Sequence, residues 1–315
     1  MSNSNSIIIF GPTGNVGRNA AIAAGKLGAK VFLAMRDPKK TIPGLSESEE
    51  KSGGFERVRA DLTDSESVKK AVKETGAKKA FFYLMHAAGD HMRGTIQALK
   101  EGGVEFVVFL SSYTVKEPLE DIPQQDTIPY GHAQVELQLL DIYGKENFVA
   151  IRPGGFATNI QMWHGDEIQK GNLKIQAPDA EFDGITAEDM GEVAGNILAK
   201  DQKDLHAVYL FGPKLLSRIE QVRIVEKALG KKFEIAEIGE EEAVQQYLTK
   251  GIPEPFAKYL ASKMAETGDS KASFAGKDWE EGVKNVERFT GHPAIGFEEW
   301  VGRNLDRFRT FDDMP

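Results

Sequence analysis

Short β-branched and aromatic runs alternate with longer helical stretches through the first half of the chain. The first run, residues 6–10, is almost wholly apolar, and the alanine-rich stretch 15–27 that follows it has helical character. A short continuous apolar run is typical of a strand buried on both faces of a parallel sheet. The same pattern predicts further strands at 30–35, 55–60, 79–85, 105–111 and 148–152 and further helices at 95–100 and 131–143.

Strands that alternate with helices predict a parallel sheet with right-handed crossovers, covered on both faces. Residues 40–54 interrupt the alternation, and their Glu, Ser, Gly and Pro content predicts a surface loop. We therefore predict an α/β fold with a doubly wound parallel sheet.

The pattern becomes irregular after Pro153. Residues 154–184 predict loops with one short amphipathic stretch, and 207–211 predicts a strand. Thr186 and Asp189 resemble a capping box at the start of a helix over 187–199. Helices are expected after that at 219–229, 240–248, 255–264 and 297–308.

Composition narrows the class of protein. The 315 residues suffice for about two domains. No apolar run approaches the ~20 residues that cross a bilayer, and a net charge of −9 disfavours a nucleic-acid surface. There is no cysteine, and the six histidines lack metal-ligand spacing, so we expect no metal. We expect a cytoplasmic protein that binds a small molecule and neither membranes nor nucleic acid.

The strongest motif is the glycine pattern between the first strand and the first helix, Gly11-Pro-Thr-Gly14-Asn-Val-Gly17. In this context glycines permit a tight turn, close approach of a pyrophosphate and close helix packing. Free N–H groups at the helix start then face the phosphates. We expect the cofactor to contact Gly11, Thr13, Gly14, Asn15 and Val16.

The end of the second strand predicts cofactor selectivity. An acidic residue there accepts from a ribose hydroxyl, whereas a basic one pairs with a 2′-phosphate. Met35 holds the usual acidic place and Arg36 follows it, with Lys40 nearby, so we predict NADP(H). Asp61 and Leu62, after the third strand, are candidates for holding adenine, although Asp61 also suits a helix N-terminus.

Polar and aromatic residues follow the later strands. Leu84 and Met85 end the fourth strand, Ser111 and Ser112 end the fifth, and Pro153 ends the sixth, and all five are expected beside the cofactor. Tyr130 is the candidate catalytic residue, with a partly buried structural aromatic as the alternative. Candidates for the substrate pocket are His86, Phe156, Ile160 and Trp163.

Residues 6–308 resemble the NmrA-like family of atypical short-chain dehydrogenases/reductases. Within that family they are most similar to members from fungal secondary metabolism. The resemblance rests on GPTGNVG, MRDP, ADLTD, FLSS, RPGGFATN and ITAEDMGEVA in that order, followed by ALGKKFEI and GFEEWVGRNLDRF. It implies an NAD(P)-binding Rossmann domain, placed here at 1–155 plus 184–213, and a mainly helical substrate domain at 156–183 plus 214–315. The resemblance implies either a reductase or a redox-sensing regulator, since the family contains both. A protein partner is expected only if the chain is a regulator.

The wider superfamily uses a Tyr-x-x-x-Lys motif to supply a proton, and here the frame reads Tyr130-x-x-x-Gln134. A neutral glutamine cannot lower a phenol pKa of ~10. We therefore predict an NADP(H)-dependent reductase that reduces C=N in preference to C=O, on a substrate such as an alkaloid-type imine, with Asp90 and Asp166 as candidate partners of a cationic substrate. The alternatives are a quinone, enone or carbonyl reductase, and a nucleotide sensor without turnover.

Overall fold

The computed structural model describes residues 5–86, 88–266 and 274–309. A seven-stranded sheet has the order β3-β2-β1-β4-β5-β6-β9, and all of its neighbouring strands pair in parallel. The order reverses between β1 and β4, and a reversal of this kind is where open α/β sheets bind ligands. The predicted Rossmann-type doubly wound sheet is thereby confirmed. The strands are β1 (Ser6–Phe10), β2 (Lys30–Met35), β3 (Glu56–Arg59), β4 (Lys79–Tyr83), β5 (Phe106–Leu110), β6 (Phe148–Pro153) and β9 (Ala207–Leu210).

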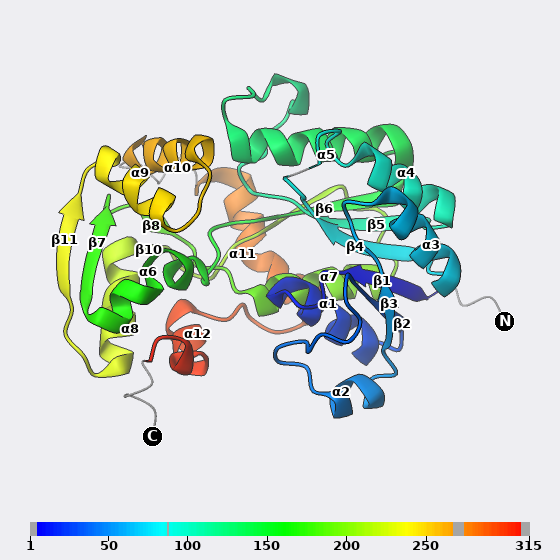
Figure 1. Cartoon of the computed structure of the whole chain (residues 1–315), viewed down its shortest axis with the longest axis horizontal. Helices are drawn as coiled ribbons and strands as arrows, with labels where there is room; N and C mark the ends of the chain where they lie inside the picture. The colour runs from blue at the N-terminus through cyan, green and yellow to red at the C-terminus, as the bar shows by residue number, and fades with distance from the viewer. Residues whose placement is uncertain (1–4, 87, 267–273, 310–315) are drawn as a thin grey trace.

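Helices cover both faces of this sheet (Figure 1). Alternate side chains of each strand enter opposite cores, so Ile7 and Ile9 pack on one face while Ile8 and Phe10 pack on the other. On the first face lie α1 (Asn15–Lys26) and α7 (Ala187–Ala199), and on the second lie α3 (Ser65–Thr75), α4 (Arg93–Gly102) and α5 (Thr127–Tyr143). Asp64 caps α3 by accepting hydrogen bonds at its carboxylate from the N–H groups of Glu66 and Ser67.

A smaller second lobe stands beside the carboxyl ends of the strands (Figure 1). Its core holds Trp300, Phe308, Ile168 and Val225. Two small sheets join segments that are distant in sequence: β7 (Asn172–Gln176) pairs in parallel with β11 (Glu234–Ile238), and β8 (Glu181–Phe182) pairs antiparallel with β10 (Leu216–Ser217). The helices of this lobe are α6 (Asn159–Lys170), α8 (Arg218–Leu229), α9 (Glu240–Thr249), α10 (Glu254–Glu266) and α12 (Phe297–Arg303).

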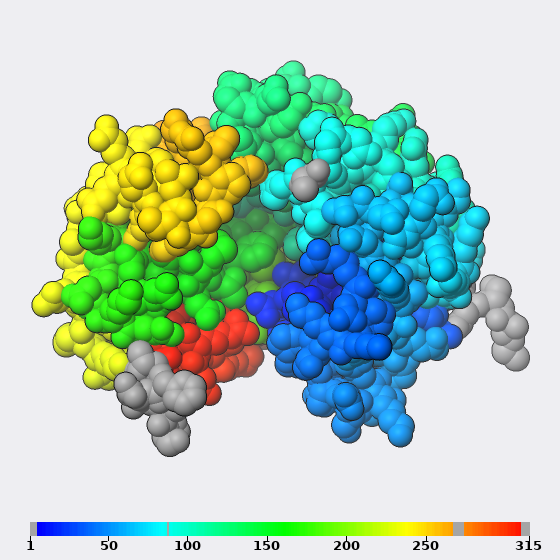
Figure 2. Space-filling model, viewed as in Figure 1, coloured from blue at the N-terminus to red at the C-terminus, as the bar shows by residue number. Residues whose placement is uncertain are grey.

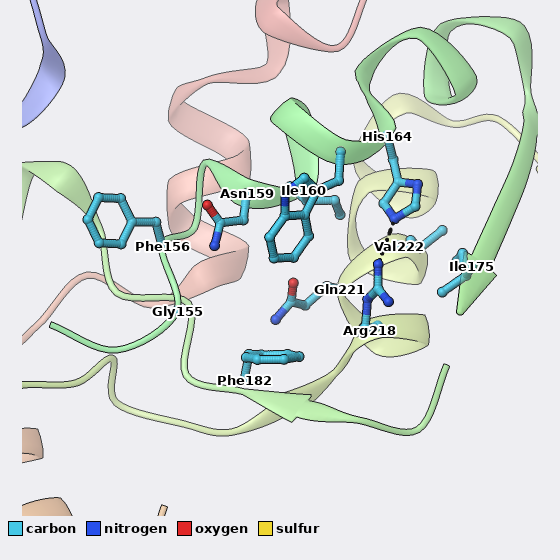
Figure 3. Close-up of a pocket in the computed structure, with 11 residues that line it drawn as sticks. Gly155, Phe156, Asn159, Ile160, His164, Ile175, Phe182, Arg218, Gln221 and Val222 are labelled. Carbon is cyan, nitrogen blue, oxygen red and sulfur yellow. Dashed lines mark hydrogen bonds between the residues drawn. The ribbon is translucent and has the colours of Figure 1, made fainter. Parts of the chain in front are cut away.

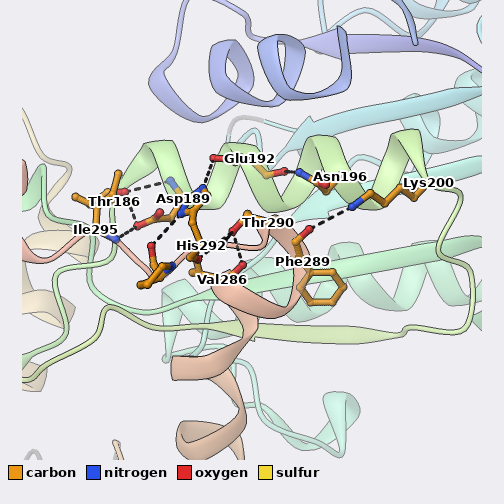
Figure 4. Close-up of polar contacts among 11 residues, drawn as sticks. Thr186, Asp189, Glu192, Asn196, Lys200, Val286, Phe289, Thr290, His292 and Ile295 are labelled. Atoms are coloured by element: carbon orange, nitrogen blue, oxygen red, sulfur yellow. Dashed lines mark hydrogen bonds and ion pairs between the residues drawn. The ribbon is translucent and has the colours of Figure 1, made fainter. Parts of the chain in front are cut away.

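Helix α11 (Gly276–Thr290) departs from the predicted division of the chain. Its Val286 and Phe289 join the core under the seven-stranded sheet. The sequence analysis instead expects all of 214–315 in the substrate domain. Three contacts fix the segment to α7: Lys200 to the carbonyl of Phe289, His292 to Glu192, and the N–H of Ile295 to Asp189 (Figure 4).

Two further stretches differ from the sequence prediction. The expected surface loop at 40–54 contains a short helix, α2 (Glu47–Ser52), closed by a capping box between Ser46 and Glu49. The amphipathic stretch expected within 154–184 is the twelve-residue helix α6, followed by β7 and β8. Among the described residues, no helix is both long and apolar enough to cross a bilayer.

Candidate functional site

The glycine loop between β1 and α1 forms an open cradle. Gly11 has a φ of 69°, a conformation that L side chains rarely adopt, and a Cβ on Gly17 would lie 2.5 Å from the Gly11 carbonyl oxygen. Gly14 is the exposed N-cap of α1, with no side-chain capping bond and no acidic residue in the first turn. The first N–H groups of α1 are therefore available to an anion.

Neighbouring residues of the loop have different roles. Thr13 lines the groove beside the loop. Asn15 accepts a hydrogen bond from Arg18 through its Oδ1, at 3.1 Å, and Val16 is buried in the core. A cofactor can reach Asn15 and Val16 through their backbone N–H groups.

The same groove continues across the ends of β2, β3 and β4. Arg36 lines it, is exposed, and has no carboxylate within ion-pair distance among the described residues. Hydrogen bonds from the Thr63 backbone and hydroxyl and the charge of Arg36 lower the pKa of Asp61, against its partial burial. Leu62 and Met85 complete the apolar wall, together with Tyr83.

Lys40 does not line this groove. Its carbonyl accepts a hydrogen bond from Arg57, at 2.9 Å, which ties the 40–54 segment to β3. Leu84 also lies outside the groove and packs against the core on the α4 and α5 side.

A larger cavity of about 530 Å³ opens between the two lobes, beyond the ends of β5 and β6. Figure 2 shows the molecule hollowed at this boundary. The cavity brings together Ser111, Ser112, Pro153, Phe156, Trp163 and His86, all predicted from sequence. Ile160 lies instead in a small adjoining cavity.

The polar groups at the end of β5 are held by hydrogen bonds. The Ser111 hydroxyl donates to Glu136 at 2.5 Å, and the hydroxyls of Ser112 and Thr114 are 2.8 Å apart. Tyr113 stacks on Phe274, and burial raises the pKa of its phenol, so it remains protonated.

Two histidines face the cavity as neutral rings. His132 contacts the carbonyl of Ile128 through Nδ1 at 2.8 Å, and because a carbonyl only accepts, Nδ1 carries the proton. Burial lowers the pKa of His132 to about 4 and also lowers the pKa of His86. The ring of His86 lies edge-on to Phe256, 4.9 Å between centroids.

Tyr130 does not line the cavity, although His132 on the same helix does. Its ring is edge-on to His91, 5.8 Å between centroids. The carboxylates of Asp90 and Asp166 are also absent from the cavity wall; Asp90 accepts instead from the N–H of Gly94, at 2.8 Å. The position of Tyr130 outside the cavity wall therefore fits the alternative that it is a partly buried structural aromatic.

Helix α10 supplies a wall that the sequence prediction did not include. The sequence predicts this helix, but its amphipathic pattern does not show which apolar residues face solvent-filled space. It contributes Phe256, Tyr259, Leu260, Lys263 and Met264. Lys263 is the one cation in the described wall and lies 2.9 Å from Glu266 and 3.5 Å from Asp126.

Asp183 joins the two lobes behind the cavity. This fully buried carboxylate accepts from the N–H groups of Gly155 and Gly212, at 2.7 and 2.8 Å. Burial raises its pKa to about 7, against backbone hydrogen bonds that lower it. Asp183 therefore connects the ends of β6 and β9 to the start of the second lobe.

The strand order, the glycine cradle and the adjoining cavity define a dinucleotide-binding protein of the Rossmann class. The chain belongs to the NmrA-like family, whose model matches residues 3–301. It is 35% identical over 324 residues to nitrogen metabolite regulation-like protein bik4 of Gibberella fujikuroi, covering 96% of this chain and 97% of the relative.

Other relatives carry the names of reductases. The chain is 24% identical to a (4-alkanoyl-5-oxo-2,5-dihydrofuran-3-yl)methyl phosphate reductase of Streptomyces griseus, covering 96% of this chain and 99% of the relative. A solved NADPH-dependent quinone oxidoreductase of Escherichia coli, complexed with NADPH, has the same fold with a TM-score of 0.69 at 20% identity, covering 95% and 99% of the two chains. The chain is therefore similar over nearly its whole length to proteins named as reductases.

Proposed function

We propose that this protein is an NADP(H)-dependent reductase of a small, planar, conjugated molecule. The observation that carries the proposal is the cavity of about 530 Å³ against the carboxyl ends of β5 and β6. Its volume lies in the range typical of small-molecule sites, and its wall is mainly apolar and aromatic with a few polar groups. A sensor without turnover needs no such space.

The residues present fit a dinucleotide phosphate. The exposed N-cap Gly14 and the free N–H groups at the start of α1 suit the pyrophosphate. Arg36 is free to pair with a 2′-phosphate, and Leu62 and Met85 offer apolar contact to adenine. When bound, the reduced cofactor supplies a hydride. The chain then has to orient an acceptor over the ends of β5 and β6 and exclude water.

The cavity wall supports a neutral acceptor better than a cationic one. None of its described residues is an aspartate or glutamate, and its single ionic group is Lys263. An iminium ion would find no carboxylate there, so this geometry weakens the sequence-based preference for C=N reduction. A quinone or enone acquires negative charge on oxygen as hydride arrives, and Lys263 and the hydroxyls at the end of β5 suit that charge.

Proton delivery supports the same substrate class. A ketone requires a proton at the developing alkoxide as hydride arrives. The buried phenols and neutral histidines of the wall are weak acids, and Gln134 replaces the superfamily lysine. A quinone distributes the negative charge over its ring, so water can protonate it afterwards.

A matched panel tests this proposal: naphthoquinones, enones, cyclic imines and aryl ketones, each with NADPH. We expect quinones or enones to be reduced fastest and Tyr130→Phe to leave their rates within about two-fold, because Tyr130 lies outside the cavity wall. Fastest reduction of ketones, abolished by Tyr130→Phe, would contradict the proposal. Fastest reduction of imines would restore the C=N prediction.

A second candidate, a nucleotide-responsive regulator, is favoured by the name of the 35% identical relative. It predicts tight binding of NADP(H) with no turnover of any panel member. Calorimetric binding of NADPH combined with the absence of oxidation by the whole panel would select this function.

A further inference from the structure

A small cavity lies beside the large one, between α6 and α8 (Figure 3). Its volume of about 20 Å³ accommodates one water-sized group. The two cavities share part of their walls: Gly155, Phe156, Asn159, Trp163 and Phe182. The smaller cavity is therefore adjacent to the larger one.

Arg218 lies at the base of this small cavity. It is 6% exposed, donates from Nη1 to the carbonyl of Gln176, and has its Nη2 3.0 Å from Nε2 of His164. Tyr247 also shares a hydrogen bond with the guanidinium. Within the described parts of the chain, no carboxylate forms an ion pair with Arg218. A buried cation held by neutral acceptors alone retains a strong attraction for negative charge.

His164 keeps this cation in place without neutralising it. Its Nδ1 lies 2.7 Å from Glu167, and a carboxylate accepts, so Nδ1 carries the proton and Nε2 presents its lone pair to Arg218. Burial lowers the pKa of His164, and the ring stays neutral. The guanidinium is thereby held in the cavity wall by a relay that begins at Glu167.

Trp163 lines both cavities and carries a donor without a described partner. Its ring lies 5.6 Å from the guanidinium carbon of Arg218. The indole Nε1–H is buried and has no acceptor among the described residues. Buried donors almost always have a partner, so this group has room for an acceptor beyond the described residues, which a bound molecule can supply.

We propose that the small cavity binds an oxygen with full or partial negative charge on the substrate: one oxygen of a carboxylate, phenolate or conjugated carbonyl. Arg218 and the Trp163 indole donate to it, while the aromatic body of the same molecule fills the larger cavity. The proposal rests on the proposed function for the location of that body. The volume excludes a phosphate or sulfonate from entering whole.

Equilibrium binding separates the oxygen from the ring that carries it. The probes are 2-naphthoate, 2-naphthol and 2-methylnaphthalene, measured without NADPH against the wild type and three variants. Trp163→Phe removes the indole donor and retains a ring, and Arg218→Gln removes the buried charge. Arg223→Gln removes an exposed charge from the same helix outside both cavities and is the matched control, which should bind every probe as the wild type does. The expected loss of 2-naphthoate affinity is about ten-fold in Trp163→Phe and larger in Arg218→Gln. Binding of 2-methylnaphthalene should change less than two-fold in either variant.

Equal losses for 2-naphthoate and 2-methylnaphthalene, or unchanged 2-naphthoate binding in Trp163→Phe, would overturn the proposal. The Trp163→Phe arm decides the matter if Arg218→Gln does not fold. Binding of 2-naphthol relative to 2-naphthoate tells whether phenolic or carboxylate oxygens are preferred. If 2-naphthoate binding depends on Arg218 and Trp163 but no substrate is reduced by NADPH, the oxygen site is retained and the reductase function is rejected. If substrates are reduced at unchanged rates by Trp163→Phe and Arg218→Gln, the reductase function is retained and the oxygen site is rejected.

Discussion

Glu136 and Arg152 form an ion pair in which the two side chains are 0% and 2% exposed, with Oε2 2.6 Å from Nη2. The other carboxylate oxygen accepts from Ser111, which lines the large cavity. Arg152 also donates to Tyr209 at 3.1 Å. The pair therefore connects the core between α5 and β6 to the polar edge of the site.

Removing one member of this ion pair should destabilise the protein more than replacing both members by apolar residues. Glu136→Leu leaves a buried guanidinium with only the exposed carboxylate of Glu117, at 3.6 Å, and we expect a loss of about 3 kcal/mol in the free energy of unfolding. The double variant Glu136→Leu with Arg152→Met removes both charges and should recover most of that loss. Urea unfolding of the three proteins checks this, and a double variant as unstable as the single one would contradict it.

The substitution Gly14→Asp should abolish nucleotide binding and leave the fold intact. Gly14 is the N-cap of α1, where φ is −83° and aspartate is a preferred residue, but a Cβ there would lie 3.3 Å from the Gly11 carbonyl oxygen. The two effects oppose each other, so the Gly14→Asp protein should fold with only a small change in thermal stability. The same carboxylate would repel the pyrophosphate, so calorimetry should detect no NADPH binding. Unchanged affinity for NADPH would remove the cofactor assignment.

Arg36→Ala should change the choice of cofactor. Losing a charge-assisted hydrogen bond to the 2′-phosphate should weaken NADPH by about 1.5–3 kcal/mol and leave NADH nearly unaffected. Lys39→Ala is the matched control, because Lys39 is exposed nearby but does not line the groove. Dissociation constants for both cofactors test the prediction, which equal losses for NADPH and NADH would refute.

His132 should make stability depend on pH. Its folded pKa of about 4 is below the ordinary 6.5, so the unfolded chain binds more protons between these values and the contribution of His132 is lost as pH falls. The stability difference between wild type and His132→Asn should decrease by about 2–3 kcal/mol from pH 7 to pH 4. A pH-independent difference would show that the ring is not held neutral.

Asp183 should give stability a pH dependence opposite in sign to that of His132. Its folded pKa of about 7 exceeds the ordinary 3.8, so the folded chain holds the extra proton and stability falls as pH rises through this interval. Asp183→Asn removes this dependence and also places an amide against the N–H of Gly155 or Gly212, costing about 1–3 kcal/mol. Chemical unfolding at pH 5 and pH 8 measures both effects.

Periodicity identified the sheet well because its strands are continuous apolar runs. The predicted bounds of β1 and β2 match the structure to the residue, and those of the other five strands differ by at most a few residues. The second lobe was harder to predict. Strands β7 and β11 are half exposed and pair across about sixty residues, so neither carries the pattern of a buried strand.

The cofactor cradle was predictable because glycine spacing between a strand and a helix has a specific cause. Arg218 was not, since an arginine at a helix start resembles a surface cation until its partners Gln176 and His164 are known. Tyr130 shows the converse difficulty. Its place in a superfamily motif suggested chemistry, but which helical face meets the cavity depends on how α10 packs over α5.

The return of α11 to the sheet has a consequence for how this protein is made. Val286 and Phe289 complete a core begun by Ile7 and Ile9, so the nucleotide-binding half lacks part of its interior until nearly the whole chain has left the ribosome. The second lobe also waits for the end of the chain, because its own core includes Trp300 and Phe308. A protein shortened before residue 276 would leave the apolar side of β9 and α7 uncovered, a surface prone to aggregation.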